Sequence, residues 1–202
     1  MDALRRCVVV LLFAAAVVRA ESVPDGAAIA TAARTQVGVT TSYDPSYRRI
    51  AYPNGDVPID TGVCADVVVR ALRGIGIDLQ SEVNADMRAH FSAYPANWGL
   101  SKPDRNIDHR RVPNLRRWFQ RKGWSLGVSD DAADYLPGDL VSWTLPNGRP
   151  HIGVVSSRRA VSGRPLVVHN IALGAREEDV LFAWTITGRY RKPQAMTPPS
   201  GA

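Results

Sequence analysis

The strongest constraint on the fold is a change in sequence periodicity between the two halves of the chain. In the first half, apolar residues recur at intervals of three and four, the spacing that places them on one face of a helix. In the second half, runs rich in β-branched residues alternate with turn residues, which is typical of strands. Helices followed by strands predict an α+β domain in which N-terminal helices pack on a C-terminal antiparallel β-sheet.

The sequence predicts four helices and four strands. The expected helices cover residues 25–38, 61–73, 81–91 and 113–122. The expected strands cover residues 140–145, 151–157, 166–171 and 179–184. Asp60 and Thr61 are candidate N-caps of the second helix, and Gly74 follows its last turn. Asn147-Gly148 predicts a tight hairpin between the first two strands.

Residues 1–20 have the features of a signal peptide. Two arginines precede an apolar run, and a small-residue site ends at Ala20. The run is about a dozen residues long, whereas a membrane-spanning helix needs roughly 20. We therefore expect cleavage near Ala20, no membrane span in the mature protein, and a periplasmic or secreted location.

Removal of residues 1–20, which carry three Arg and one Asp, leaves 182 residues, enough for one domain. We place that domain at 21–191, with a disordered tail at 192–202. The net charge falls from +6 to about +4, which suits work near anionic cell-wall polymers but does not argue for nucleic acid. We expect a monomer without a nucleic-acid partner.

Cys64 is the one cysteine that remains after cleavage, because Cys7 lies in the segment that is removed. It is therefore either a buried apolar side chain or a reactive thiol. It shares a helical face with Val67 and Val68, which favours burial. Its place in the first helical turn favours reactivity, because N–H groups there stabilise a thiolate and lower the pKa of the thiol. The residues alone leave both interpretations open.

Two histidines lie in consecutive expected strands. His151 opens one strand, and His169 and Asn170 lie in the next. Either His169 or Asn170 could fix the tautomer of the His151 ring, as the third group of a thiol–imidazole pair does. Because side chains alternate along a strand, only one of the two faces the site, and the sequence does not decide which.

Residues 102–122 hold eight Lys and Arg against two Asp. The arginines at 116, 117 and 121 lie opposite an apolar helix face, which indicates a solvated surface. Arg110 and Arg111 lie in an irregular stretch and are candidates for binding substrate carboxylates. Neither a metal-binding spacing nor a phosphate-binding loop occurs, so we expect no metal and no cofactor.

The order of these motifs resembles a known family. Phrases such as "YPNGDVPIDTGVCADVV", "NIDHRRVPNL" and "HIGVVS…VVHNI" are similar to members of the secreted bacterial family called domain of unknown function 1287, from about residue 27 to 191. More distantly, a tyrosine-bearing loop, a cysteine that opens a helix, "PGDLVSW" and "HIGVVSS" resemble the NlpC-type cell-wall peptidases. That resemblance implies a papain-like fold and a cysteine hydrolase.

The resemblance also implies roles for individual residues. Cys64 falls at the nucleophile, His151 at the general base and His169 at the residue that orients the base. Tyr43 matches the tyrosine that lines the nucleophile pocket. The peptidases usually read Asp-Cys-Ser at the nucleophile, whereas this chain reads Val-Cys-Ala with Asp66 two positions on. Residues beside a nucleophile line the first subsite, so Asp66 joins Arg110, Arg111 and Asn170 as a candidate substrate-binding residue.

Three functions are compatible with these residues. The first is an exported hydrolase that cleaves an amide or peptide bond, with peptidoglycan stem peptides as the expected substrate. The second is an acyltransferase, in which an amine or hydroxyl in place of water resolves the thioester. The third is a non-catalytic module that binds an anionic wall polymer.

Overall fold

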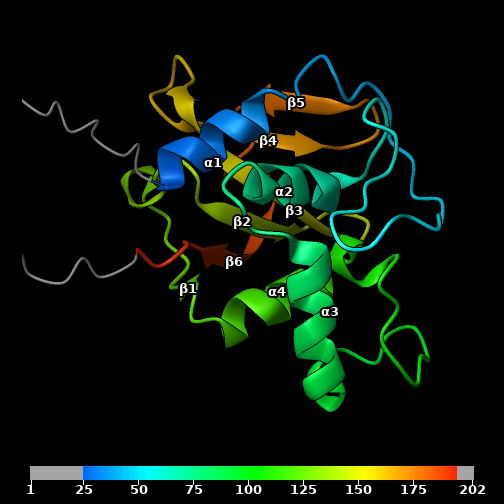
Figure 1. The fold of residues 1–202 in the computed structure, drawn as a ribbon. Helices are drawn as coiled ribbons and strands as arrows, with labels where there is room; N and C mark the ends of the chain where they lie inside the picture. Colours follow the sequence, from blue (N-terminus) through cyan, green and yellow to red (C-terminus); the bar gives the residue numbers. More distant parts are fainter. Residues whose placement is uncertain (1–24, 195–202) are drawn as a thin grey trace, which may run out of the picture.

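A computed structural model describes residues 25–194 as four α-helices, three short 3₁₀ helices and six strands (Figure 1). The α-helices are α1 (Asp25–Arg34), α2 (Cys64–Arg73), α3 (Leu79–Ala89) and α4 (Val112–Arg121). The 3₁₀ helices are η1 (Phe91–Ala93), η2 (Asp108–Arg110) and η3 (Ala132–Asp134). The strands are β1 (Ser125–Leu126), β2 (Leu140–Thr144), β3 (Pro150–Arg159), β4 (Pro165–Asn170), β5 (Ala175–Glu178) and β6 (Thr185–Tyr190).

The strands of the described chain form one six-stranded antiparallel sheet in the order β1-β6-β2-β3-β4-β5. Helices α1 and α2 lie across its centre and contact β3 (Figure 1). Helices α3 and α4 pack against each other beside α2. The predicted α+β class, with N-terminal helices on a C-terminal antiparallel sheet, is confirmed.

The two faces of the sheet bury different clusters, because side chains alternate along each strand. On the helix side, Ile152, Val154 and Val168 pack in a cluster that includes Cys64. On the opposite side, a smaller cluster contains Trp143, Val155, Val167 and Leu181. Residues at odd positions in β3 therefore face away from the helices, and His151 is one of them.

The predicted strand at 179–184 is wrong, since these residues form the connection between β5 and β6. Leu181 is fully buried against the second cluster, and its carbonyl accepts a hydrogen bond from Nε1 of Trp143 at 2.9 Å. The apolar residues of this connection pack over one face of the sheet. A buried loop of this kind has the same apolar composition as a buried strand, so the sequence pattern does not separate the two.

The start of α2 also differs from the prediction. The helix begins at Cys64 with Val63 as its N-cap, so neither Asp60 nor Thr61 caps it. Instead, Oδ2 of Asp66 turns back and accepts the backbone N–H of Val63 at 2.6 Å. This is the second half of a capping box, in which the third helical residue satisfies the N-cap N–H. The predicted helix at 25–38 is shorter as well, because it ends at Arg34.

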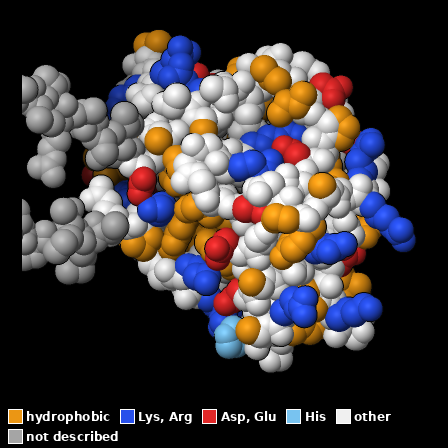
Figure 2. All heavy atoms as spheres, viewed as in Figure 1, with side chains coloured by type: hydrophobic (Ala, Val, Ile, Leu, Met, Phe, Trp, Pro, Cys, Tyr) orange, Lys and Arg blue, Asp and Glu red, His pale blue; other side chains and the backbone are white. Residues whose placement is uncertain are grey.

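Helix α4 buries Leu115, Trp118 and Phe119, as predicted from its apolar face. Its arginines, however, are not simply solvated. Nη2 of Arg116 donates to the Thr187 carbonyl at 3.0 Å, and Nε of Arg117 donates to the Ala93 carbonyl at 2.7 Å. Nε of Arg121 lies 2.6 Å from Oδ2 of Asp86. These guanidinium groups tie α4 to neighbouring elements. Figure 2 shows basic side chains spread over this face among polar and hydrophobic atoms, with no single basic stripe.

The expected signal peptide and residues 195–202 of the expected tail lie outside the described residues. Both ends of the described chain lie on the same side of the molecule (Figure 1), and Nζ of Lys192 lies 2.5 Å from Oδ2 of Asp25. Between residues 25 and 194, no helix combines the length and apolar character that crossing a membrane requires.

Candidate active site

Cys64 is the first residue of α2, and its side chain is buried at the helix N-terminus. Burial raises the pKa of the thiol to about 12, and the Asp66 carboxylate adds to that shift. Hydrogen bonding from the backbone of Ile152, Ala65 and Cys64 itself opposes the shift without reversing it. The sequence leaves a buried side chain and a reactive thiol equally open. The raised pKa agrees with the buried interpretation, because removal of the thiolate from water outweighs the backbone N–H groups.

His151 and His169 form a hydrogen-bonded pair across the end of the sheet. Nε2 of His151 lies 2.9 Å from Nδ1 of His169, and both side chains are buried. The far nitrogen of the second ring, Nε2 of His169, lies 3.0 Å from Oε2 of Glu178 on β5. Two imidazoles and a carboxylate are therefore connected in one line. The sequence predicted the histidines but missed Glu178.

The geometry places His169, not Asn170, beside the ring of His151. Asn170 points to the helix side, where its Nδ2 donates to the carbonyls of Gly62 at 2.9 Å and Ser42 at 3.3 Å. Asn170 is fully buried and connects the end of β4 to the loop that leads into Cys64. The observed contacts of the Asn170 side chain are with the protein backbone, and its role in substrate binding stays a prediction.

The ring of His151 lies in an aromatic environment. Its centroid is 5.8 Å from that of Trp143 and 5.5 Å from that of Trp184. Burial, and then the neighbouring His169, lower the pKa of His151 to about 3. The imidazole is therefore neutral at neutral pH, and a neutral imidazole has one nitrogen that can accept a proton.

Cys64 and His151 approach the same end of β3 from its two faces. The thiol is close enough to Ile152 for the backbone of that residue to lower the pKa of the thiol. The His151 ring belongs to the residue immediately before it. Within residues 25–194 the thiol and the imidazole share no hydrogen bond, and neither histidine lines the pocket that contains the Cys64 side chain.

A pocket of about 420 Å³ opens beside the thiol. Its lining includes Cys64, Tyr43, Tyr47 and Trp98, together with Pro150 at the start of β3. Burial raises the pKa of Tyr43 to about 12, and the nearby Cys64 adds to that shift. The phenol is thus protonated at neutral pH and can donate a hydrogen bond into the pocket.

Asp66 and Arg110 are paired with each other. Nε of Arg110 lies 2.8 Å from Oδ1 of Asp66, and Nη2 lies 2.9 Å from Oδ2, a bidentate contact between two buried side chains. Arg110 also lines the pocket beside Cys64. Because each charge is neutralised by the other, the pair holds η2 against the first turn of α2.

Arg111 lines the same pocket with a different set of contacts. Nη1 of Arg111 lies 2.8 Å from Oδ1 of Asp108, and the guanidinium lies 4.1 Å from the ring centroid of Trp98. A single contact with one carboxylate oxygen leaves further N–H donors on the guanidinium. Of the two predicted carboxylate-binding arginines, Arg111 is therefore the one with donor capacity at the pocket.

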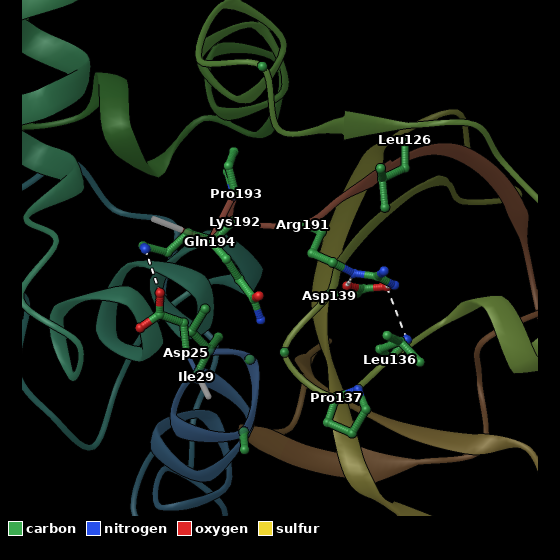
Figure 3. A pocket seen from close by; sticks show the side chains of 14 residues that line it. Asp25, Ile29, Leu126, Leu136, Pro137, Asp139, Arg191, Lys192, Pro193 and Gln194 are labelled. Carbon is green, nitrogen blue, oxygen red and sulfur yellow. Dashed lines mark hydrogen bonds and ion pairs between the residues drawn. The ribbon is translucent and has the colours of Figure 1, made fainter. Parts of the chain in front are cut away.

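A larger pocket of about 670 Å³ lies elsewhere, between the start of α1 and the end of the described chain (Figure 3). Asp139 and Arg191 pair within it, and Ile29, Leu136 and Pro137 supply apolar walls. Neither the cysteine nor the histidines line it. The volume of a pocket therefore does not identify the site, and the smaller pocket is the one that contains the Cys64 thiol. Among residues 25–194, no three His, Cys, Asp or Glu side chains gather in a metal-binding arrangement.

The fold and the site together define an α+β protein with a cysteine at a helix N-terminus and a histidine pair at the adjoining end of the sheet. The chain belongs to the family described as "Domain of unknown function (DUF1287)", whose model matches residues 30–192. This confirms the family resemblance found in the sequence.

Two further similarities accompany the family match. "Uncharacterized protein YijF" of Escherichia coli (strain K12) is 56% identical over 164 residues, which cover 81% of this chain and 80% of that protein. Among solved structures, NlpC1 from Trichomonas vaginalis matches with a TM-score of 0.48 and 14% identity. The match covers 86% of this chain but only 46% of that one.

Proposed function

We propose that the protein is a thiol hydrolase that cleaves an amide or peptide bond, with Cys64 as nucleophile and His151 as general base. One observation carries the proposal. A line of hydrogen-bonded side chains runs from the partly exposed Glu178 through the buried His169 to the buried His151. It ends at the start of β3, where the backbone lies against the Cys64 thiol. Burial of two imidazoles is costly unless they are hydrogen-bonded, and a third group that orients a base is typical of nucleophilic catalysis.

The proposed reaction starts from a neutral thiol and a neutral imidazole, because the pKa of Cys64 is raised to about 12 and that of His151 is lowered to about 3. The proton therefore moves as the bond forms. The reaction requires the His151 ring to turn toward the thiol, or a water molecule to bridge the two groups, because they share no hydrogen bond in the described part of the chain. Sγ then attacks the carbonyl carbon while Nδ1 of His151 takes the thiol proton. The carbonyl oxygen gains negative charge, which the Cys64 N–H and the Tyr43 hydroxyl stabilise.

The intermediate then collapses. The bond between carbon and nitrogen breaks, and the imidazolium of His151 gives its proton to the leaving amine, which leaves a thioester on Cys64. Water attacks the thioester, its proton passes to His151, and the thiolate that departs recovers a proton from the imidazolium. Atoms and charge balance without a cofactor.

The expected substrate is a peptidoglycan stem peptide, and the pocket supports that choice. Arg111 retains donors for a carboxylate, and aromatic rings of Tyr43, Tyr47 and Trp98 supply flat apolar surface around the thiol. The proposal places the protein in the periplasm or outside the cell, which follows from the signal peptide that the sequence predicts.

The test uses the mature protein, residues 21–202, and its Cys64→Ala and Cys64→Ser variants. Each is incubated with peptidoglycan, and soluble products are identified by mass spectrometry. We expect new fragments from the wild type alone, with masses that identify the bond. Fragments from all three proteins would exclude Cys64 as the nucleophile. A parallel incubation with an added amine separates hydrolysis from acyl transfer, because a transferase would give an amine adduct.

A non-catalytic binding module is the second candidate. Two observations favour it: the raised pKa of the Cys64 thiol, and the lack of a hydrogen bond between Cys64 and His151 in the described residues. If this candidate is correct, wild type and Cys64→Ala pellet equally with insoluble peptidoglycan and release no fragments. Loss of binding on Arg111→Ala would then identify the pocket beside Cys64 as the binding surface.

A further inference from the structure

The side chain at the end of the histidine line is Glu178, the last residue of β5. Strand β5 pairs with β4, and the register sets His169 opposite Arg176 and Val167 opposite Glu178. Oε2 of Glu178 reaches Nε2 of His169 at 3.0 Å. The carboxylate is 37% exposed while the His169 side chain is fully buried, so Glu178 connects the buried imidazoles to the surface.

The neighbouring acid on the same strand has a different environment. Glu177 points to the other face of the sheet, where it accepts a hydrogen bond from Ser156 and lies 3.3 Å from Nε of Arg34. Glu177 and Glu178 are thus adjacent on the same strand, but their side chains point to opposite faces of the sheet. Only one of them contacts the histidine pair.

The direction of each hydrogen bond follows from the carboxylate. An ionised carboxylate can only accept, so Nε2 of His169 has to carry a hydrogen. A neutral His169 then has a bare Nδ1, which accepts from Nε2–H of His151. A neutral His151 with a hydrogen on Nε2 has a bare Nδ1. That is the nitrogen free to take a proton from a nucleophile.

We propose that Glu178 is a positioning residue that fixes the tautomers of both histidines, so that Nδ1 of His151 is unprotonated in the resting protein. Its use in catalysis rests on the proposed function, whereas the tautomers do not. The hydrogen bonds could all point toward Glu178 or all point away from it, because each imidazole can donate from either nitrogen. The Glu178 carboxylate is the one group in this line that selects between these two arrangements.

The charged groups around the pair are consistent with this role. Burial keeps the pKa of His169 below its ordinary value, while the Glu178 carboxylate opposes that shift and Arg176 reinforces it. Among residues 25–194, His169 is the one titratable group that influences the pKa of His151. When His151 takes a proton, Glu178 is therefore the negative charge that the relay places nearest to it.

The test compares the wild type with Glu178→Gln and the matched control Glu177→Gln, using full mature protein labelled with ¹⁵N. Two-bond proton–nitrogen NMR correlations distinguish the Nδ1–H and Nε2–H tautomers of each histidine. We expect Nε2–H tautomers for both His151 and His169 in the wild type and in Glu177→Gln. In Glu178→Gln we expect a mixture, because an amide can accept from Nε2 or donate to it.

Activity provides the second readout. With a substrate found by the peptidoglycan assay, Glu178→Gln should lower kcat by about 10- to 100-fold and leave KM unchanged. In serine proteases, where the carboxylate contacts the general base directly, its replacement by an amide lowers kcat by about 10⁴-fold. Glu178 acts through one further ring, so the effect is smaller. Glu177→Gln should retain wild-type kcat.

The outcomes separate this proposal from the proposed function. A wild-type His151 in the Nδ1–H form, or an unchanged tautomer pattern in Glu178→Gln, overturns the role of Glu178 even if the protein hydrolyses peptidoglycan. The expected tautomers together with an inactive wild type leave the assignment of Glu178 intact and count against hydrolysis instead.

Discussion

Nε2 of His151 and Nδ1 of His169 lie 2.9 Å apart across adjacent strands, on the face of the sheet that the helices do not cover. The orientation of the proposed base is therefore set by the sheet and by Trp184, which packs against the His151 ring from the connection between β5 and β6. The thiol comes from the opposite layer, at the N-terminus of α2. The candidate site thus combines a thiol from the helix layer with imidazoles from the sheet, and substitutions in one layer should leave the other layer's groups in place.

Replacement of His169 should mainly lower kcat, whereas replacement of Asn170 should mainly lower the free energy of unfolding. His169→Ala removes the partner of His151, so we expect kcat to fall by about 10²-fold or more, since a general base contributes roughly 10²–10⁴-fold. Asn170→Ala removes the side-chain donor to the Gly62 and Ser42 carbonyls and should cost about 1–3 kcal/mol of unfolding free energy, the sum for two hydrogen bonds. Kinetics on peptidoglycan fragments and urea denaturation measure the two effects. Equal kinetic losses in both variants would contradict the assignment of His169.

The pair of Asp66 and Arg110 should be a major contributor to stability. Both side chains are almost fully buried, and removal of one partner leaves an unpaired buried charge. We expect Arg110→Ala to lower the unfolding free energy by about 3–5 kcal/mol. Urea denaturation gives the value. The double variant Asp66→Asn/Arg110→Met should recover part of the loss, because it leaves no charge; a further loss in the double variant would show that the pair is not the cause.

Gly153 should be required for the histidine pair. A Cβ at this position would lie 2.9 Å from the Val168 carbonyl and 3.1 Å from Cβ of His169. Gly153→Ala therefore pushes β4 away from β3, with an overpacking cost of about 1–3 kcal/mol. We expect a lower melting temperature and altered His151 and His169 NMR signals. Gly127→Ala is the control, because a Cβ there meets nothing within 4 Å.

Alkylation of Cys64 should depend steeply on pH. Only the thiolate reacts, and the pKa of the thiol is raised to about 12. The rate with iodoacetamide should therefore rise about tenfold for each pH unit between 7 and 10, with no plateau near the ordinary pKa of about 8.5. Mass spectrometry of the labelled protein follows the reaction. Fast labelling that stays constant down to pH 5 would show instead that Cys64 and His151 rest as an ion pair.

The sequence predicts well what local patterns encode. The helix that begins near Cys64 follows from apolar spacing, and the strands that contain His151 and His169 follow from β-branched runs. Glu178 could not be found in this way, since β5 reads "AREE" and has no apolar alternation. Its importance comes from the register between β4 and β5, which no local pattern shows.

Long-range contacts account for the remaining differences. Asp66 and Arg110 are 44 residues apart, so their pairing could not be read from the spacing within either segment. The sequence leaves the direction of the pKa shift at Cys64 open for a related reason. The helix N-terminus is a local feature, whereas burial of the thiol depends on β3 and on the whole helix-side cluster.

The division of the candidate site between two layers has a consequence for how its reactive groups come together during folding. The thiol lies on α2 and both imidazoles lie more than two helices later in the chain, on strands that must first find their register. A partly synthesised or incompletely folded chain therefore contains every reactive group without their alignment. If the proposed hydrolysis is correct, it would require the helix layer and the sheet to be packed together, so an unfolded chain would be inactive although it contains the same reactive groups.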